Sequence, residues 1–394
     1  MTIQGLPVLA PERAEITTRV ATVAGLAAAS GIDALVILEP ANVYYLSGFR
    51  TTLHTRYTAV ALRTAQPEEA TLIAPGVDRK LALEPVWFPS LLPNTKIYYE
   101  GAPGGGAVVN APGPLLAELI RDGDTIGVDL AGASYGQVQM LNDRFPQATI
   151  VDATPLLHEA RRVKSPFEIE TLRRANAIAV EVFGLVPGWL QPGLTEIDLA
   201  CKLDTAARER GADDFGYPTL VGFGPKSLAP HAPPLAHPLV PDRIVTIAFG
   251  PAVAGYCADI VRTFFYGTPP ALAVESGERT IAIQAAAIGA VRAGARAGDL
   301  MLAAREVVLQ CAPDAPAQGR AGHSVGLTIH ETPSLTADND MPLTVDMVLA
   351  IEPGAPGALM DGIGLYRHCD VVRVTEDGYE LLTPLARGLQ IVPV

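Results

Sequence analysis

The 394-residue sequence predicts a two-domain protein of the α/β (α+β) class. Helix-like and strand-like segments alternate over the first part of the chain, which is typical of a layered α/β sheet. A strong helix-start signal follows at Ser165, and strand patterns dominate from Arg243 to the end. A chain of this length can bury two separate cores. We therefore expect one domain over residues 1–160 and a second over residues 161–394.

The first domain is expected to begin with an amphipathic helix, which Pro11 opens and which runs to about Ser30. Short strand-like runs bounded by Gly, Pro or Asp follow it. These runs are Ala34–Leu38, Thr71–Ala74, Lys96–Tyr99, Thr125–Leu130 and Thr149–Val151. The glycine-rich stretch Gly101–Gly106 lacks the Lys-Ser/Thr pair of a phosphate-binding loop, so we interpret it as a surface loop.

The second domain is expected to start with a helix at Ser165. Ser165 and Glu168 have the spacing of an S-x-x-E capping box, and Pro166 occupies the favoured first helical position. Further helices are expected near residues 195–210 and 276–293. Hydrophobic runs at Ile244–Ile247 and Val348–Ile351 indicate strands.

Composition limits the classes of partner. The net charge of −13 argues against nucleic acid or an anionic membrane surface, because both require clustered Lys and Arg. The N-terminal segment lacks the features of a signal peptide, and no apolar run reaches about 18 residues. The four cysteines show no C-x-x-C spacing. We expect a cytoplasmic protein with reduced thiols and a small-molecule ligand.

Five short segments in the second half place histidines or acidic residues close to glycine or proline, or next to one another. They are Pro230-His231, Gly255–Asp259, Gly322–Glu331, Ile351–Gly354 and Arg367–Asp370. A strand that ends in such a group exposes it at a sheet edge or in a cleft. A single histidine is more often a core residue, but five segments in one domain favour a shared pocket.

Several motifs carry a resemblance to a known superfamily. RRVKSPFEIETLRRA, GYCADIVRTF, GHSVGLTIHETP and AIEPG resemble, in order and spacing, the motifs of the pita-bread enzymes, which include creatinase, aminopeptidase P and prolidase. The first domain resembles the N-terminal domain of creatinase. The resemblance implies a creatinase-type N-terminal α/β domain followed by a pita-bread catalytic domain.

The resemblance also implies a metal site that this sequence has partly lost. Metallopeptidases of the superfamily hold two ions with Asp, Asp, His, Glu and Glu. The matching positions here are Ala248, Asp259, His323, Glu352 and Cys369. Two ligands are thus replaced, and we expect an enzyme with no metal cofactor. The alternative is a single Zn, Fe or Mn ion at Asp259, His323, Glu352 and Cys369.

Without a metal, Asp259 and Glu352 would lie close together, so one of the two pKa values should rise. His231 matches the histidine that creatinase uses as its proton-transfer base, and His330 matches the second histidine of the H…H-E motif. Seven residues separate His323 from His330, and Gly326 would permit a bend that brings both to one pocket. We predict His231, His330 and Glu352 as catalytic residues.

The predicted substrate-binding residues are Arg56, Asp259, His323, His368 and Cys369. Arg56 matches, through the Tyr44–Gly48 segment, an arginine that creatinase supplies across its dimer interface to bind the substrate carboxylate. This match implies a homodimer and a substrate with a carboxylate; a solvated surface arginine is the alternative.

The creatine-binding glutamates of creatinase correspond here to Val261 and His368, so creatine is not predicted as the substrate. The leading prediction is a creatinase-like, metal-independent hydrolase of a C–N bond in a small amino-acid-like molecule. The alternatives are a single-metal Xaa-Pro-type peptidase, a lyase or rearrangement enzyme on the same scaffold, and a non-catalytic binding protein.

Overall fold

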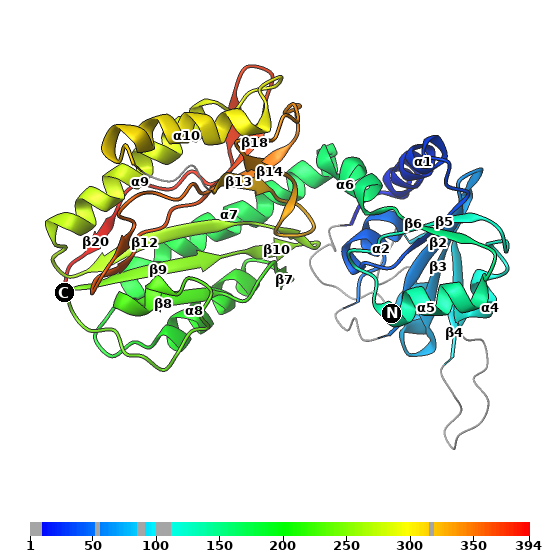
Figure 1. Ribbon diagram of the computed structural model, residues 1–394. Helices are drawn as coiled ribbons and strands as arrows, with labels where there is room; N and C mark the ends of the chain where they lie inside the picture. Colours follow the sequence, from blue (N-terminus) through cyan, green and yellow to red (C-terminus); the bar gives the residue numbers. More distant parts are fainter. Residues whose placement is uncertain (1–9, 52–55, 85–90, 100–111, 315–318) are drawn as a thin grey trace. The chain divides into compact units, whose positions relative to one another are not determined.

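The computed structural model describes residues 10–51, 56–84, 91–99, 112–314 and 319–394 (Figure 1). The predicted loop Gly101–Gly106 lies outside these ranges. The chain divides into two compact units, Met1–Arg161 and Arg162–Val394. The predicted division after residue 160 differs from this division by one residue.

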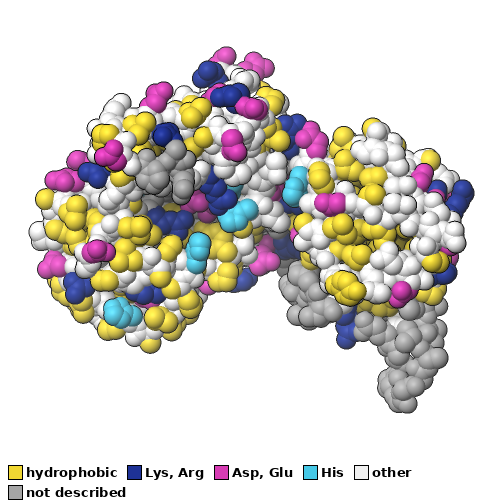
Figure 2. Space-filling view, viewed as in Figure 1, with side chains coloured by type: hydrophobic (Ala, Val, Ile, Leu, Met, Phe, Trp, Pro, Cys, Tyr) yellow, Lys and Arg dark blue, Asp and Glu magenta, His cyan; other side chains and the backbone are white. Residues whose placement is uncertain are grey.

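The surface carries charges of both signs. Acidic and basic side chains are interspersed over the face shown in Figure 2. In the described ranges, no helix is both long enough and apolar enough to cross a membrane.

The first unit is built on one six-stranded sheet with the strand order β4-β3-β2-β1-β5-β6. The pairs β1–β5, β5–β6 and β3–β4 are parallel, whereas β2 runs antiparallel to both β1 and β3. The strands are β1 (Ala34–Ile37), β2 (Ala59–Arg63), β3 (Gln66–Pro75), β4 (Asn94–Tyr98), β5 (Thr125–Val128) and β6 (Thr149–Asp152). The helices are α1 (Arg13–Ala29), α2 (Pro40–Ser47), α3 (Arg79–Leu83), α4 (Pro112–Leu116), α5 (Tyr135–Arg144) and α6 (Thr154–Arg162).

The first unit contains the helix and the five strands predicted for it, with shifts at their ends. Strand β2 was not predicted. All but the last of its five residues are buried, so it lacks the alternation of apolar and polar residues that marks a half-exposed strand. The core of this unit includes Val36, Ile73 and Val128 of the sheet and Leu141 of α5.

Helix α7 (Pro166–Trp189) opens the second unit as predicted. The Ser165 hydroxyl accepts a hydrogen bond from the Glu168 N–H at 3.2 Å, and the Glu168 carboxylate accepts one from the Ser165 N–H at 2.9 Å. The predicted helices near 195–210 and 276–293 are present as α8 (Glu196–Glu209) and α9 (Ala271–Gly289). Helix α10 (Ala297–Cys311) was not predicted.

The strands of the second unit form two main sheets and two smaller ones. One main sheet has the order β20-β12-β9-β8 and contains β8 (Leu220–Phe223), β9 (Arg243–Phe249), β12 (Ile260–Tyr266) and β20 (Gln390–Val392). The other has the order β14-β13-β15-β18-β19 and contains β13 (Arg320–Ser324), β14 (Glu331–Thr336), β15 (Val348–Ile351), β18 (Asp370–Val374) and β19 (Tyr379–Leu381). The smaller sheets contain β7 (Asp214–Phe215), β10 (Pro251–Val253), β11 (Tyr256–Cys257), β16 (Leu359–Met360) and β17 (Gly364–Leu365).

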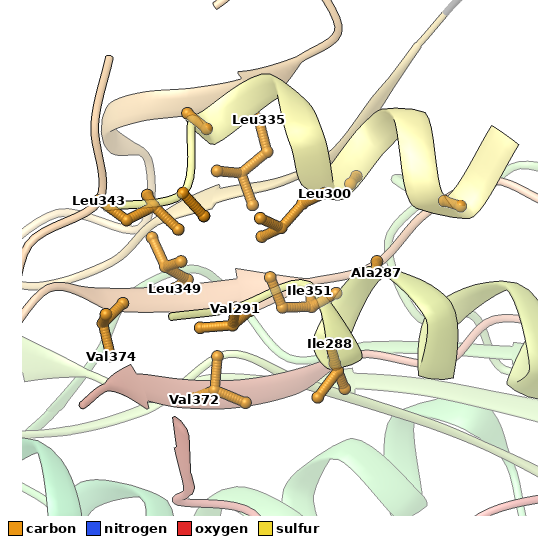
Figure 3. Packing of buried hydrophobic residues seen from close by; sticks show 14 of the residues in the cluster. Ala287, Ile288, Val291, Leu300, Leu335, Leu343, Leu349, Ile351, Val372 and Val374 are labelled. Atoms are coloured by element: carbon orange, nitrogen blue, oxygen red, sulfur yellow. The ribbon is translucent and has the colours of Figure 1, made fainter. Parts of the chain in front are cut away.

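Helices cover these sheets in two pairs. Helices α9 and α10 contact β13, β14 and β15, whereas α7 and α8 contact β8, β10 and β11. The core between the first pair and its sheet contains Ile288 and Leu300 from the helices, and Leu349, Ile351 and Val372 from the strands (Figure 3). This packing fixes the ends of β13 and β15, where polar residues of the site are attached.

Candidate functional site

A cavity of about 320 Å³ lies in the second unit. Four of the residues predicted for the site line it, namely His231, Asp259, His330 and Glu352. The other lining residues include Tyr217, Ala248, Val261, Arg320, Ile329 and Arg367. Figure 2 shows histidine, basic and acidic side chains gathered on one face of this unit. A cavity of this kind does not fit a collapsed or plugged site, which would favour a non-catalytic binding protein.

The two main sheets together supply the polar groups. Asp259 immediately precedes β12, His323 lies on β13, and Glu352 immediately follows β15. A bridge between Val261 and Cys369 joins the first sheet to the segment before β18. His323 pairs with Ala350 on the neighbouring strand, and the Glu352 N–H donates to the Ala321 carbonyl at 2.8 Å. The backbone therefore brings all three side chains to one place.

The imidazole of His323 is buried between the two carboxylates. Its Nε2 atom lies 3.5 Å from Asp259 Oδ2 and 3.6 Å from Glu352 Oε1 and has no hydrogen-bond partner. Its Nδ1 atom lies 3.1 Å from the Ser324 carbonyl oxygen, which can only accept, so Nδ1 carries a proton. In the neutral ring, the bare lone pair of Nε2 therefore faces two anionic groups. That arrangement becomes favourable when either a proton or a metal cation lies between them.

The two carboxyl groups differ in their proton affinity. Burial, reinforced by the charge of Glu352, raises the pKa of Asp259, whose Oδ1 accepts a hydrogen bond from the Tyr217 hydroxyl at 3.0 Å. Burial would also raise the pKa of Glu352, but His323 and Arg367 outweigh it and lower that pKa. Arg367 Nη2 donates to Glu352 Oε2 at 2.8 Å. The predicted rise of one pKa is thus confirmed for Asp259.

The two substituted ligand positions lie in one row across the strands. Leu220 pairs with Ala248, Ala248 pairs with Val261, and Val261 bridges to Cys369, so this row contains no carboxylate. Cys369 is fully buried, and its thiol donates to the backbone carbonyl of Asp259 at 3.2 Å. Burial, together with the charges of Asp259 and Glu352, raises the pKa of this thiol.

His330 and His323 come together, as their motif predicts. Their rings are nearly perpendicular, with centroids 4.4 Å apart. The bend arises from register shifts on both sides of His323 in the β13–β14 pairing, in addition to Gly326. Space at Gly326 is limited, because a Cβ atom there would lie 2.7 Å from the Glu331 carboxylate and would require that side chain to shift.

The exposed ring of His330 contacts Arg320, whose Nη2 lies 3.2 Å from its Nε2. Burial, with smaller contributions from His323 and Arg320, lowers the pKa of His330. His231 is exposed and lies in the segment that follows the short 3₁₀ helix Gly224–Leu228.

Three predicted substrate-binding residues lie outside the cavity wall. His323 and Cys369 are buried and do not line it, and their roles in binding substrate remain predictions. His368 is also buried, and its Nε2 lies 3.3 Å from Asp370 Oδ2. Successive residues of an extended segment point to opposite faces, so His368 points away from the side occupied by Arg367. Its role in binding substrate remains a prediction.

Arg56 belongs to the first unit, where it lines a separate cavity of about 540 Å³. Its role in binding a substrate carboxylate remains a prediction.

Two polar residues of the cavity wall, Tyr217 and Arg320, were not singled out from the sequence. Tyr217 orients Asp259, yet the segment around it matches none of the motifs that identified the other residues. Arg320 lies three positions before His323, on the same strand. Its nearness to the GHSVGLTIHETP motif is the only sequence signal that could have pointed to it.

Comparisons with known proteins agree over nearly the whole chain. Residues 170–376 match Metallopeptidase family M24, and residues 19–163 match the Creatinase/Prolidase N-terminal domain. An Xaa-Pro dipeptidase of Lactobacillus helveticus is 27% identical over 372 residues, covering 93% of this chain and 96% of the relative.

Solved structures give the same result. Dipeptidase PepE from Mycobacterium ulcerans has a TM-score of 0.83 at 28% identity, covering 98% of this chain and 100% of that one. A dipeptidase from Pyrococcus horikoshii has a TM-score of 0.82 at 26% identity, covering 95% and 99%. These matches confirm the predicted fold class and the resemblance to the pita-bread superfamily.

The same matches correct the expectation of an enzyme without a cofactor. The second unit matches a family of metallopeptidases, so the prediction of a metal-independent hydrolase is wrong. That prediction was based on the loss of two ligands, at Ala248 and Cys369. The sequence does not show that the remaining donors, Asp259, His323 and Glu352, lie close together.

The residues present fit one cation better than two. The unpartnered Nε2 of His323 and the facing oxygens of Asp259 and Glu352 form a mixed N/O donor set. Over the described ranges, no three His, Cys, Asp or Glu side chains are already arranged to hold an ion. Binding therefore requires small movements of the two carboxylates. A second ion would rely on Ala248 and Cys369, which supply no carboxylate.

Proposed function

The chain belongs to metallopeptidase family M24, and from this premise we propose that it is a single-metal peptidase that cleaves small Xaa-Pro-type dipeptides. As a member of that family it is a hydrolase. The names of its relatives, a dipeptidase and an Xaa-Pro dipeptidase, support the choice of substrate. The observation that carries the proposal is the bare Nε2 of His323, which faces two carboxylates at 3.5 and 3.6 Å.

Asp259, His323 and Glu352 would hold the ion. When bound, a divalent ion supplies Lewis-acid polarisation of the scissile carbonyl group. The neighbouring residues keep these donors in place: Tyr217 holds one oxygen of Asp259, and Arg367 holds one oxygen of Glu352. Each carboxylate thereby keeps its other oxygen directed towards His323.

The two histidines that line the cavity would bind the substrate and exchange protons. The guanidinium of Arg320 can only donate, so His330 Nε2 accepts and its proton lies on Nδ1. His330 is therefore arranged as a hydrogen-bond donor to a polar group of the peptide. His231, exposed on the cavity wall, would exchange protons with solvent. The proposal includes a substrate carboxylate and a homodimer in which Arg56 of a second copy reaches the substrate.

Metal content and peptide cleavage test this function together. Purified protein should contain about one Mn, Fe or Zn ion per chain, measured by inductively coupled plasma mass spectrometry. It should cleave Ala-Pro and lose this activity when a chelator removes the ion. His323→Ala should bind less than a tenth of the ion bound by the unaltered chain, because only two donors remain.

The control variant is Arg296→Ala. Arg296 lies on the exposed surface, so this variant should keep both the metal content and the peptide cleavage of the unaltered chain. Cleavage that persists in fully metal-free protein would contradict the proposal. So would two tightly bound ions per chain.

A further inference from the structure

We infer that an apolar row, which passes through one of the lost metal-ligand positions, binds an aliphatic side chain on the N-terminal residue of the substrate. The inference rests on the proposed peptidase function and names its substrate class, dipeptides whose first residue is aliphatic. The apolar row crosses three neighbouring strands of the first main sheet. Its members are Leu220, Ala248 and Val261, which pair in that order and all line the cavity.

The apolar row carries no charge and no polar side chain. Its far end meets Cys369, which bridges to Val261 and is fully buried. The Cys369 thiol donates to the backbone carbonyl of Asp259, so it keeps its proton and stays neutral. A polar side chain placed against the row would lose its water without finding a hydrogen-bond partner among these side chains. An aliphatic side chain would instead gain from the burial of its surface.

The two main sheets give the cavity walls of different chemistry. The second sheet and the segments next to its strands supply Arg320, His330, Glu352 and Arg367. The first sheet supplies the apolar row. A dipeptide has polar groups along its backbone and at its ends, whereas its side chains can be apolar. A cavity with one polar and one apolar wall therefore suits a dipeptide with an aliphatic side chain.

The position of the apolar row favours the first residue of the dipeptide. Asp259, one of the proposed metal ligands, lies two positions before Val261, and both residues line the cavity. The scissile carbonyl group, which must approach the metal ligands, belongs to the N-terminal residue. The side chain of that residue branches from the carbon atom next to this carbonyl group. We therefore expect this side chain to contact the row.

The space around Ala248 can accept a branched side chain. The cavity itself has a volume of about 320 Å³. A second cavity of about 20 Å³ shares Leu220, Ala248 and Arg367 with it, which is enough for about one more water-sized group. An aspartate at position 248 would extend into this region, whereas the methyl group of alanine leaves it open.

The experiment compares two dipeptides of the same shape, Val-Pro and Thr-Pro, in which a hydroxyl group replaces one methyl group. The wild type should favour Val-Pro by about 100-fold in kcat/KM, as is typical of an apolar pocket that meets a hydroxyl isostere. Val261→Thr should lower this ratio by about tenfold, because its hydroxyl group offers the threonine substrate a hydrogen-bond partner.

A second variant tests the space in the apolar row. Ala248→Val adds two methyl groups, so kcat/KM for Val-Pro should fall by about tenfold relative to that for Gly-Pro. The matched control is Val372→Thr. Val372 lies in the core between the second main sheet and helices α9 and α10, and it does not line the cavity (Figure 3). This control should keep the ratios of the wild type.

A wild-type ratio of Val-Pro to Thr-Pro near one overturns the inference. Unchanged ratios in Val261→Thr and Ala248→Val, in protein with a wild-type circular dichroism spectrum, also overturn it. If Val261→Thr does not fold, Ala248→Val decides. If the wild type cleaves none of these dipeptides, the proposed function fails. Binding of L-valine and L-threonine to the wild type, measured by calorimetry, then decides the role of the row: a preference for valine of about tenfold supports it, and equal binding overturns it.

Discussion

At the scale of single residues, we expect Ala248 and Cys369 to limit how many ions the cavity can hold. They lie on either side of Val261 in one cross-strand row, where an aspartate and a glutamate would direct their carboxylates towards Asp259. The three remaining donors converge from both main sheets. We therefore expect the loss to remove one ion site and leave the other.

Restoring the two carboxylates should restore the second ion. We expect Ala248→Asp/Cys369→Glu to raise the metal content from about one to about two ions per chain, measured by mass spectrometry after equilibration with Mn²⁺. Because two added buried carboxylates repel each other, the metal-free variant should unfold at a lower temperature than the wild type. Saturating Mn²⁺, at about 100 times its Kd, should add about 2.7 kcal/mol of stability.

The control is Val261→Asp, which adds a carboxylate to the same row without completing the ligand set. It should leave the metal content at about one ion. A content of one ion in the double variant would show that the backbone, rather than the two substitutions, limits the site.

The sequence alone predicts the residues of this site better than its chemistry. Asp259, Glu352, His231 and His330 lie in ordered motifs, and all four line the cavity. The absence of a metal was predicted wrongly, because counting lost ligands ignores the position of the unpartnered Nε2 of His323. The burial of His368 beside Asp370 could not be predicted, because a motif does not show which face of an extended segment a side chain takes.

At the scale of elements, His330 lies in the connection between β13 and β14. The buried ion pair between Lys164 and Glu331 holds the end of this connection in place. Lys164 Nζ lies 3.0 Å from Glu331 Oε2 and also donates to the Ser324 hydroxyl at 3.0 Å. Glu331 in turn accepts a hydrogen bond from the Thr328 N–H at 3.2 Å. The side chains of the pair are only 1% and 7% exposed, so they are shielded from water and salt.

Removing one member of this ion pair should destabilise the folded protein. We expect Lys164→Met to lower the free energy of unfolding by about 3–5 kcal/mol, because it removes a buried cation that contacts the buried Glu331 carboxylate. Lys164→Met/Glu331→Leu should recover most of that loss. Urea unfolding followed by circular dichroism measures both.

The exposed pair Arg296–Asp340 serves as a control, and Arg296→Ala should leave the unfolding curve nearly unchanged. An equally small effect of Lys164→Met would mean that water reaches the buried pair.

Short sequence motifs predict where a helix or strand begins more reliably than they predict which strands pair and in what register. The capping box at Ser165 needs only residues within one turn, and α7 begins there as predicted. The register shifts around His323 require knowledge of the partner strand, which no local pattern provides. Strand β2 was overlooked for a related reason, since its burial on both faces depends on the layers above and below it.

At the scale of the whole molecule, the two units have separate cores and separate chemistry. The buried cluster around Val36 and Val128 belongs to the first unit, and the cluster around Leu300 and Leu349 belongs to the second. Asp259, His323 and Glu352 all lie in the second unit. We therefore expect ion binding to be a property of the second unit.

The second unit should fold and bind its ion alone. A fragment of residues 162–394 is expected to unfold in a single cooperative transition and to bind about one Mn²⁺ ion, measured by circular dichroism and calorimetry. His323→Ala in the same fragment should abolish binding. A fragment that folds but binds no ion would indicate that the first unit contributes to the site.

The position of Lys164 has a mechanical consequence. This residue follows the division between the units by only three positions, yet its side chain is fixed beneath the His330 loop and its N–H is bonded to the Asp346 carbonyl at 3.0 Å. The connecting segment is thus clamped from Lys164 onward. A pull on the chain before Lys164 would therefore act, through the Lys164 side chain, on the Glu331 carboxylate next to His330.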